Sequence, residues 1–376
     1  MTQHSFPITT RKPRIVITHL EGNLVVRSWD KQEISVEANG ELNGLQQEGD
    51  TLTITGCTGD LTLWIPAIKN YIFPTITSIT ASDVRRNATI EGAGNVELRD
   101  VGGNATLENI YGNAELVNVS EIAHITALGG NLRAAHLPKL LAQKGIGGNV
   151  TLLDTRQAEF DAIGGNLAVT GAQEVVSNLV GGNLDVEQVE TLLRCHKVGG
   201  NCEVHNSSGA EIRIDIVGGN LQCQGVSRTH SSLVGGNLRL QNGAPFEGHT
   251  HFHVGGNAFI DLPENANLTI HALVGGNVSG PATIKRGGGF VNLIYGEGAA
   301  RLDVHAGGNL HLSGPSTPQS SSTGWSWDDF SREMADFTSS MSGVGHEMGK
   351  VGREIGREME KVGREISREF KRAFRD

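Results

Sequence analysis

Ile146-Gly147-Gly148-Asn149-Val150-Thr151-Leu152 and Ile163-Gly164-Gly165-Asn166-Leu167-Ala168-Val169 are two copies of one pattern. Each copy has a Gly-Gly-Asn turn, with an aliphatic residue three positions before the Asn and others one and three positions after it. Related Gly-Asn turns place asparagines at Asn95, Asn104, Asn113, Asn131, Asn149, Asn166, Asn183, Asn201, Asn220, Asn237, Asn257, Asn277 and Asn309. The first two gaps are nine residues, the next seven run from 17 to 19, and the last three are 20, 20 and 32.

A repeat near 18 residues with a half-repeat of nine is too short for pairs of helices. After each turn, apolar and polar residues alternate, as in Val150-Thr151-Leu152, and this period of two indicates a strand with one buried face. The sequence therefore predicts an all-β fold. It is a single-chain β-solenoid of about 12 or more short coils, each adding two strands and stacking on the coil before it.

The turn residues suit the corners of such coils. Glycine reaches positive φ without steric cost, and asparagine tolerates the left-handed region better than most residues. Stacked at one corner, the Asn side chains would lie about 4.8 Å apart, close enough for hydrogen bonds from amide to amide. A phosphate-binding loop would instead need a glycine-rich turn between a strand and a helix, and no such context is present.

The chain divides by pattern into five parts. Residues 1–65 form a strand-rich N-terminal part of the solenoid, and residues 66–90, with Pro66 and Pro74, are expected to be an irregular joint or insertion. The regular solenoid covers residues 91–314. Residues 315–324, rich in serine and proline, indicate a flexible linker. Residues 325–376 predict an amphipathic helix.

Composition excludes some function classes. The 376 residues include 51 glycines and only 5% aromatic residues, which suits a narrow core, and the formal net charge is −10. An acidic body argues against nucleic acid as a partner, because phosphate binding needs a basic surface. No secretory signal and no run of about 18 apolar residues is apparent, so we expect a cytoplasmic protein or one at a membrane surface. The cysteines Cys57, Cys195, Cys202 and Cys223 do not have metal-site spacing, and Cys202 and Cys223 fall on inward positions.

The N-terminal part resembles a known family. Gly22-Asn23-Leu24-Val25-Val26-Arg27-Ser28-Trp29-Asp30, Glu33–Ala38, Asp50–Ile54 and Leu63–Pro66 are similar to the opening hairpin and repeats of the bacterial putative-adhesin β-strand-repeat family. The resemblance covers roughly residues 13–314, although this chain favours Gly-Gly-Asn over Gly-Asp and adds a C-terminal helix. It implies a binding or surface role and no catalytic residues. A bactofilin-like filament is the second resemblance, since bactofilins also use short glycine-punctuated coils.

The tail contains an 11-residue repeat, Lys350–Glu360 followed by Lys361–Lys371. Eleven residues make three helical turns, so apolar residues stay on one side of a nearly straight helix. They are Phe330, Met334, Phe337, Met341, Val344, Met348, Val351, Ile355, Met359, Val362, Ile366, Phe370 and Phe374. Such a helix is not stable alone in water, so another copy of the tail, a membrane surface or the solenoid body must cover it. We expect self-association, as a homo-oligomer or filament, through the tail or the coil ends.

One group of residues invites a chemical interpretation. His249, His251 and His253 alternate on one predicted strand, and His271 is expected above His251 one coil later. Imidazoles on one face can bind Zn, Ni or Cu, but a row of exposed polar residues is the plainer interpretation. We predict no cofactor and no catalysis, because paired carboxylates and Ser/His/Asp arrangements are not apparent. The expected function is a non-catalytic structural or binding solenoid that self-associates or scaffolds through its tail. The alternative is a peripheral membrane or envelope-stress module tethered by the same helix.

Overall fold

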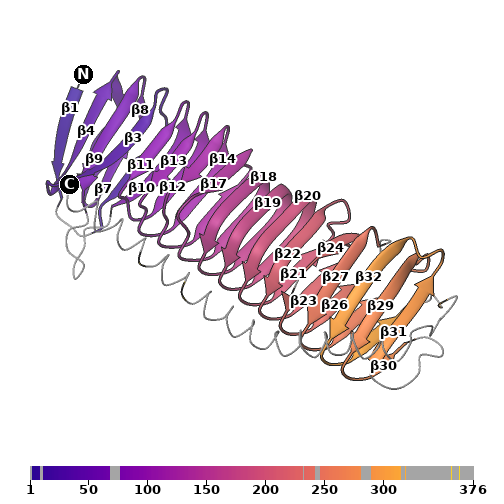
Figure 1. Cartoon of the computed structure of the whole chain (residues 1–376). Coiled ribbons are helices and arrows are strands. Elements are labelled where there is room, and N and C mark those ends of the chain that lie inside the picture. Colours follow the sequence, from indigo (N-terminus) through magenta and orange to yellow (C-terminus); the bar gives the residue numbers. More distant parts are fainter. Residues whose placement is uncertain are drawn as a thin grey trace. The chain divides into compact units, whose positions relative to one another are not determined.

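A computed structural model describes residues 2–8, 12–67, 77–231, 233–241, 246–280 and 289–314, together with 318, 357 and 364. These residues form 33 β-strands, so the body of the protein is all-β, with long runs of parallel pairing (Figure 1). The predicted tail, residues 325–376, lies outside the described residues except for Arg357 and Arg364, where the backbone is helical and the side chains are exposed. No helix among the described residues is long and apolar enough to cross a membrane.

The β-strands divide between two units, with the boundary between Leu167 and Ala168 at the start of β19. The first contains β1 (Thr2–Pro7), β2 (Arg14–Ile17), β3 (Leu24–Trp29), β4 (Glu33–Asn39), β5 (Leu42–Asn43), β6 (Gln46–Glu48), β7 (Thr51–Ile54), β8 (Gly56–Cys57), β9 (Asp60–Pro66), β10 (Ser78–Val84), β11 (Ala88–Glu91), β12 (Val96–Val101), β13 (Ala105–Glu108), β14 (Ala114–Val119), β15 (Ile122–Ile125), β16 (Leu132–Ala135), β17 (Lys139–Ala142) and β18 (Val150–Ile163).

The second contains β19 (Leu167–Val180), β20 (Leu184–Val198), β21 (Cys202–His205), β22 (Glu211–Val217), β23 (Leu221–Gln224), β24 (Arg228–His230), β25 (Leu233–Val234), β26 (Leu238–Gln241), β27 (His249–Val254), β28 (Ala258–Asp261), β29 (Leu268–Val274), β30 (Val278–Ser279), β31 (Gly289–Tyr295), β32 (Ala300–Ala306) and β33 (Leu310–Ser313).

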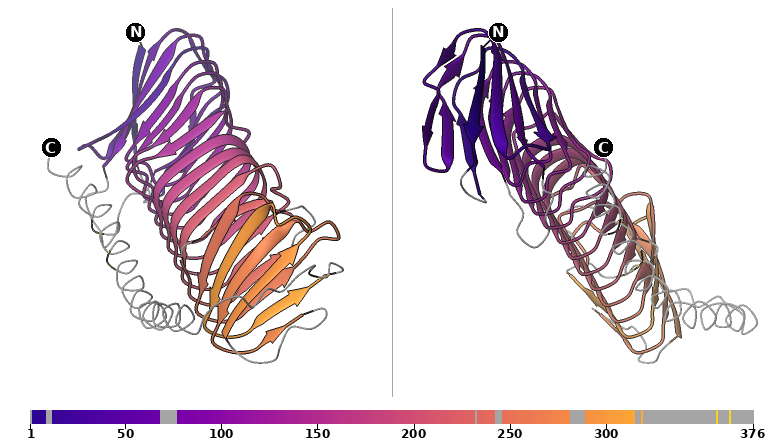
Figure 2. Two further views of the ribbon diagram at one scale, coloured as in Figure 1. Left: turned by 45° about the vertical axis from the view of Figure 1, so that its right-hand side comes forward. Right: turned by 90° about the vertical axis from the view of Figure 1, so that its left-hand side faces the viewer.

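In the middle of the first unit, strands pair in parallel with strands one repeat away. β12 pairs with β10 and β14, while β13 pairs with β11 and β15, so each coil of about 18 residues adds one strand to each of two rows. Figure 2 shows these successive coils from two sides (indigo to magenta). This pairing is consistent with a β-solenoid. Within the expected irregular joint, residues 66–90, β10 and most of β11 pair in parallel with β12 and β13 as in a regular coil. Residues 68–76 of that segment lie outside the described residues.

The three predicted apolar columns form the core. In the coil around Asn149, Ile146, Val150 and Leu152 are each at most 1% exposed. The column before the turn stacks on itself, since Ile146 forms parallel bridges to both Leu128 and Ile163. Each such side chain contributes roughly 1.5–3 kcal/mol when buried. One coil would not offset the conformational entropy of its own chain, whereas a stack of coils can.

The turn asparagines form a ladder, in which the backbone N–H is a donor as well as the side-chain amide that the sequence predicts. In the first unit the backbone N–H of Asn149 donates to Oδ1 of Asn131 at 2.8 Å, and that of Asn131 donates to Oδ1 of Asn113 at 2.8 Å. The side-chain amide of Asn131 also donates to Oδ1 of Asn113, at 3.0 Å. The second unit repeats the arrangement, with the backbone N–H of Asn220 donating to Oδ1 of Asn201 at 2.9 Å.

The reason for the glycines differs from the expected one. Gly147, in a Gly-Gly-Asn turn, does not have a left-handed φ, but a Cβ placed there would lie 2.5 Å from the carbonyl oxygen of Gly129 in the neighbouring coil. Close approach of two backbones therefore requires the glycine. In the coils with these turns, the residues whose φ is left-handed lie five positions after the turn asparagine. They include Asp100, Asn118, His136, Asp154, Gln188 and Asn206, all with φ between 47° and 59°.

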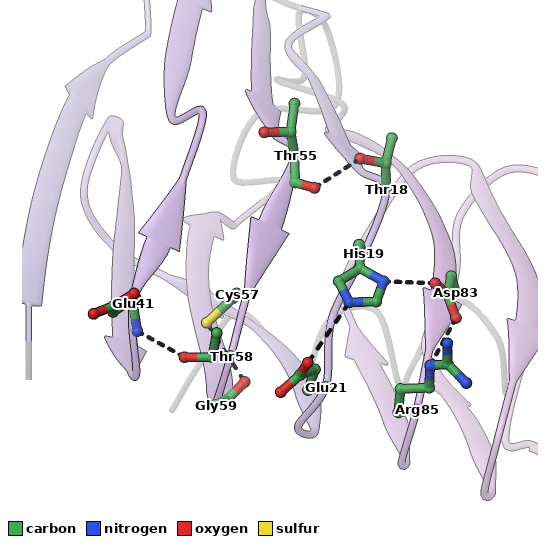
Figure 3. Close-up of polar contacts among 10 residues, drawn as sticks. All are labelled: Thr18, His19, Glu21, Glu41, Thr55, Cys57, Thr58, Gly59, Asp83 and Arg85. Atoms are coloured by element: carbon green, nitrogen blue, oxygen red, sulfur yellow. Dashed lines mark hydrogen bonds and ion pairs between the residues drawn. The ribbon is translucent and has the colours of Figure 1, made fainter.

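Both units depart from chain order at one end, contrary to the expectation that each coil stacks on the one before it. In the first unit, β2 pairs in parallel with β7 and β10, so the coil that begins the chain lies between two later coils. Figure 3 shows the contacts on both sides of it. The Thr18 hydroxyl donates to the Thr55 carbonyl oxygen at 3.2 Å, and His19 Nδ1 lies 2.6 Å from Asp83 Oδ2.

In the second unit, β32 lies between β27 and β29 and pairs in parallel with both (Figure 1). The asparagine ladder follows the same order, because the backbone N–H of Asn309 donates to Asn257 and that of Asn277 donates to Asn309. The coil formed by β32 and β33 is therefore inserted between two coils that precede it in the sequence.

Antiparallel strands cover the outer coil at each of these ends. In the first unit β4 pairs antiparallel with β9 and with β1, and β6 pairs antiparallel with β7. In the second unit β31 pairs antiparallel with β29. Because an antiparallel strand does not present the ladder that a parallel coil would continue, these strands act as caps on the parallel stack.

Candidate metal centre

The inserted strand β32 brings together residues that lie far apart in the chain. His251 and His253 on β27 are opposite Asp303 and His305 on β32, respectively. Phe252 and Val254, between and beyond the two histidines, are fully buried, so the histidines project from the outer face as the alternation predicts. On the other side of β32, His271 of β29 is opposite Asp303.

The expected position of His271 directly above His251 is wrong. β32 separates the two strands, and Asp303 lies in register between the two histidines. His305, which our sequence analysis did not select, occupies the place beside His253. The sequence holds a signal for it, since His253 and His305 each lie four residues before a turn asparagine, Asn257 and Asn309.

Three imidazoles form a compact group, here called the His triad: His251, His253 and His305. Their candidate ligand atoms all lie within 4.8 Å of one another. The ring centroids are 4.4 Å apart for His251 and His253, 5.2 Å for His251 and His305, and 4.8 Å for His253 and His305. The rings meet edge to face, and Nε2 of His251 lies 2.7 Å from Nε2 of His253.

Partial burial keeps these rings neutral. Loss of solvation, with smaller contributions from His253 and His305, lowers the pKa of His251 to about 4. Loss of solvation also lowers the pKa of His253 and the pKa of His305. At neutral pH each ring therefore keeps a nitrogen lone pair, which is the form that binds a transition metal. Nδ1 of His253 is buried and has no hydrogen-bond partner within the described part of the chain.

Asp303 is the centre of an ionic network beside the triad. His249 Nε2 lies 2.7 Å from its Oδ2, Arg301 Nε lies 2.9 Å from its Oδ1, and His271 Nδ1 lies 3.5 Å from Oδ1. Burial by itself raises the pKa of Asp303, but the hydrogen bonds from Arg301 and His249 and their charges lower it overall. The carboxylate is thus ionised at neutral pH, with its side chain only 12% exposed.

A cavity of about 260 Å³ adjoins the triad and this network. Its lining includes His251, His305, Asp303, Arg301 and Phe290, the last from the capping strand β31. His251 and His305 thus border open space large enough for water or a small ligand.

Other His–Asp contacts differ from the triad. His19 lies 2.6 Å from Asp83 (Figure 3), and His196 lies 2.6 Å from Asp215, in each case between neighbouring coils. The side chains of His19 and His196 are 42% and 53% exposed. Such exposed pairs contribute little to stability and need no ligand to explain them. The triad is distinct because it gathers half-buried imidazoles.

The first unit has a larger cavity, of about 500 Å³, beside the asparagine corners Asn95, Asn113 and Asn131. Two carboxylates line it, Glu97 and Glu115, and Arg99 forms ion pairs with both, at 2.7 and 2.6 Å. Arg99 offsets one of these two negative charges, and Arg133 also lines the cavity.

All four cysteines are reduced and buried. Cys202 and Cys223 lie on inward positions, as expected, and are fully buried. Loss of solvation raises the pKa of Cys195 and of Cys223 to about 12, and raises the pKa of Cys202 well above its ordinary value. These thiols are not nucleophiles at neutral pH, because the thiolate is the reactive form.

We expect iodoacetamide at pH 8 to leave Cys195, Cys202 and Cys223 unmodified in the folded protein. Unfolding in urea should expose all three to rapid modification. Peptide mass spectrometry of samples quenched with and without urea measures the difference. Equal modification in both samples would contradict the burial that we describe.

Comparisons with known proteins add little. No family model matches the chain, and a search of curated proteins finds no match. Among solved structures, the chain is similar to a putative cell adhesion protein from Clostridium sporogenes, with 10% sequence identity and a TM-score of 0.14. That match covers 84% of this chain and 99% of the other. A TM-score of this size does not establish a common fold or function.

Proposed function

We propose that this protein is a non-catalytic β-solenoid that serves as a scaffold or binding module and self-associates through its C-terminal helix. The observation that supports it most is the capping of the parallel stack. β4 and β6 cover the outer coil of the first unit, and β31 covers strand β29 of the outer coil of the second. Parallel pairing of coil ends between copies would have to displace these strands, so the tail is the better candidate for assembly.

The sequence of the tail supplies the second reason. Its stripe of 13 apolar residues, from Phe330 to Phe374, needs a partner, because an isolated helix with such a face is not stable in water. The Glu and Arg residues that flank the stripe suit contacts between helices. The resemblance of residues 13–314 to the putative-adhesin family is in keeping with a binding role, and family membership remains a prediction.

Light scattering tests the proposal. We expect the full-length protein to have a mass of at least twice 40.0 kDa, and a truncated protein ending at Gly314 to be monomeric. In the full-length chain, Ile355→Glu should abolish association because it places a charge in the apolar stripe. Ile355→Leu is the matched control and should leave association intact, because it keeps an apolar side chain of the same size in the stripe.

A monomeric full-length protein would refute self-association. In that case, flotation with liposomes decides the alternative of a membrane-tethered module. Flotation that is lost on truncation at Gly314 and on Ile355→Glu would support the tether, and a tail that stays in the soluble fraction would exclude it.

A further inference from the structure

The His triad has the composition of a transition-metal site. Three imidazoles without a coordinating carboxylate or thiolate suit divalent ions of intermediate softness such as Zn²⁺, Cu²⁺ and Ni²⁺, whereas Mg²⁺ and Ca²⁺ prefer oxygen ligands. Asp303 is engaged by His249 and Arg301, so the three rings form the complete set of protein ligands. A fourth position would then be open to water, on the side where His251 and His305 border the 260 Å³ cavity.

The distances are close to those of a bound metal. With bonds of about 2.05 Å and tetrahedral angles, ligand nitrogens lie about 3.3 Å apart. The observed separation of 2.7 Å between Nε2 of His251 and Nε2 of His253 would have to widen by about 0.6 Å. The other pairs, which lie within 4.8 Å, would close by at most about 1.5 Å. Small rotations of half-exposed rings on rigid strands achieve such shifts.

Charged groups of both signs lie beside the triad. Asp303 lies directly across from His251 in the register of β27 and β32, and Asp303 and its ion-pair partner Arg301 both line the cavity. Nε2 is the ligand atom of His253 in this geometry, because it contacts His251 while Nδ1 of the same ring is buried, without a hydrogen-bond partner within the described residues.

We propose that His251, His253 and His305 bind one divalent transition-metal ion, with Zn²⁺ as the reference ion, and that this ion links β27 to β32. The two strands are adjacent in space, although 52 residues separate His253 from His305. A metal that joins them would hold the inserted coil in place in the way that a cross-link closes a long loop. This proposal does not depend on self-association through the tail.

Calorimetric titration of chelator-treated full-length protein with Zn²⁺ tests it. We expect one tight site per chain, and affinity lower by at least about a hundredfold in His251→Gln and in His305→Gln, because each variant loses a ligand. His271→Gln is the matched control, since it lines the same cavity on the neighbouring strand but lies outside the triad, and it should bind as wild type does. Zn²⁺ should also raise the melting temperature of wild type and not that of His305→Gln.

Wild type that does not bind Zn²⁺ at a single tight site would overturn the proposal, as would His305→Gln that binds as tightly as wild type. If His271→Gln and His305→Gln lose Zn²⁺ affinity equally, the assignment of ligands is overturned. Circular dichroism in chelator checks that each variant is folded. If a variant is not folded, electron paramagnetic resonance of the Cu²⁺ complex of wild type tests the ligand set instead. The spectrum should show three imidazole nitrogens coupled to the copper, and fewer would overturn the proposal. Association through the tail should be unchanged in His305→Gln, which separates this result from the test of the proposed function.

Discussion

Replacing Gly147 by alanine is expected to lower the free energy of unfolding by about 3 kcal/mol, the upper part of the range for overpacking. The added Cβ would lie 2.5 Å from the carbonyl oxygen of Gly129, which is backbone and has no rotamer to change. Relief requires the two coils to separate, and separation weakens the 2.8 Å hydrogen bond from the Gly147 N–H to the carbonyl oxygen of Leu128. Urea unfolding followed by circular dichroism measures the change.

Gly56→Ala is the matched control in the same unit. Gly56 also lacks a left-handed φ, and the nearest atom to its added Cβ is 3.7 Å away, an ordinary contact. Its effect should be within about 1 kcal/mol of zero, and slightly stabilising if the reduced freedom of the unfolded chain dominates. A loss in Gly56→Ala as large as that in Gly147→Ala would contradict the explanation by the distance between coils, because a Cβ at Gly56 meets no close contact.

Replacing Phe252 by alanine is expected to cost about 3–5 kcal/mol, the usual range for removal of a buried aromatic ring. Phe252 is 0% exposed on the inner face of β27, between His251 and His253. The narrow core around it is made of aliphatic side chains on rigid ladders, which cannot collapse into the space left by the ring.

Phe259→Ala is the comparison that isolates burial. Phe259 lies on the next strand, β28, where its side chain is 41% exposed, so its removal should change stability by no more than about 0.5 kcal/mol. Both variants are measured by urea unfolding in chelator, so that metal binding does not contribute. If the two variants lose similar amounts of unfolding free energy, the alternation of inward and outward residues on β27 and β28 is misassigned.

The two kinds of substitution address different properties of the coil. Gly147 tests how closely backbones stack at a corner, and Phe252 tests what fills the interior. Together they account for the composition of the chain, which combines many glycines with few aromatic residues. A solenoid coil has little interior volume, so large side chains such as Phe252 are exceptional and correspondingly costly to remove.

The repeat by itself determined the local packing of each coil. Ile146, Val150 and Leu152 are buried where the period places them, and the side chains of Asn113 and Asn131 form the hydrogen bond that their spacing predicts. These features follow from sequence because they depend on contacts that every coil repeats with its neighbour. The glycine corner was located correctly but explained wrongly, since the short distance from Gly147 to the adjacent backbone exists only once coils are stacked.

The tertiary structure alone decided the order of coils at the two ends, and with it the His triad. Coils with equivalent turns and ladders can pair with one another in several orders, so a local pattern does not specify which coil adjoins which. The insertion of β32 between β27 and β29 placed His305 beside His253 and put Asp303 between His251 and His271. Sequence identified the histidines of β27, whereas their partners depended on pairing across 52 residues of chain.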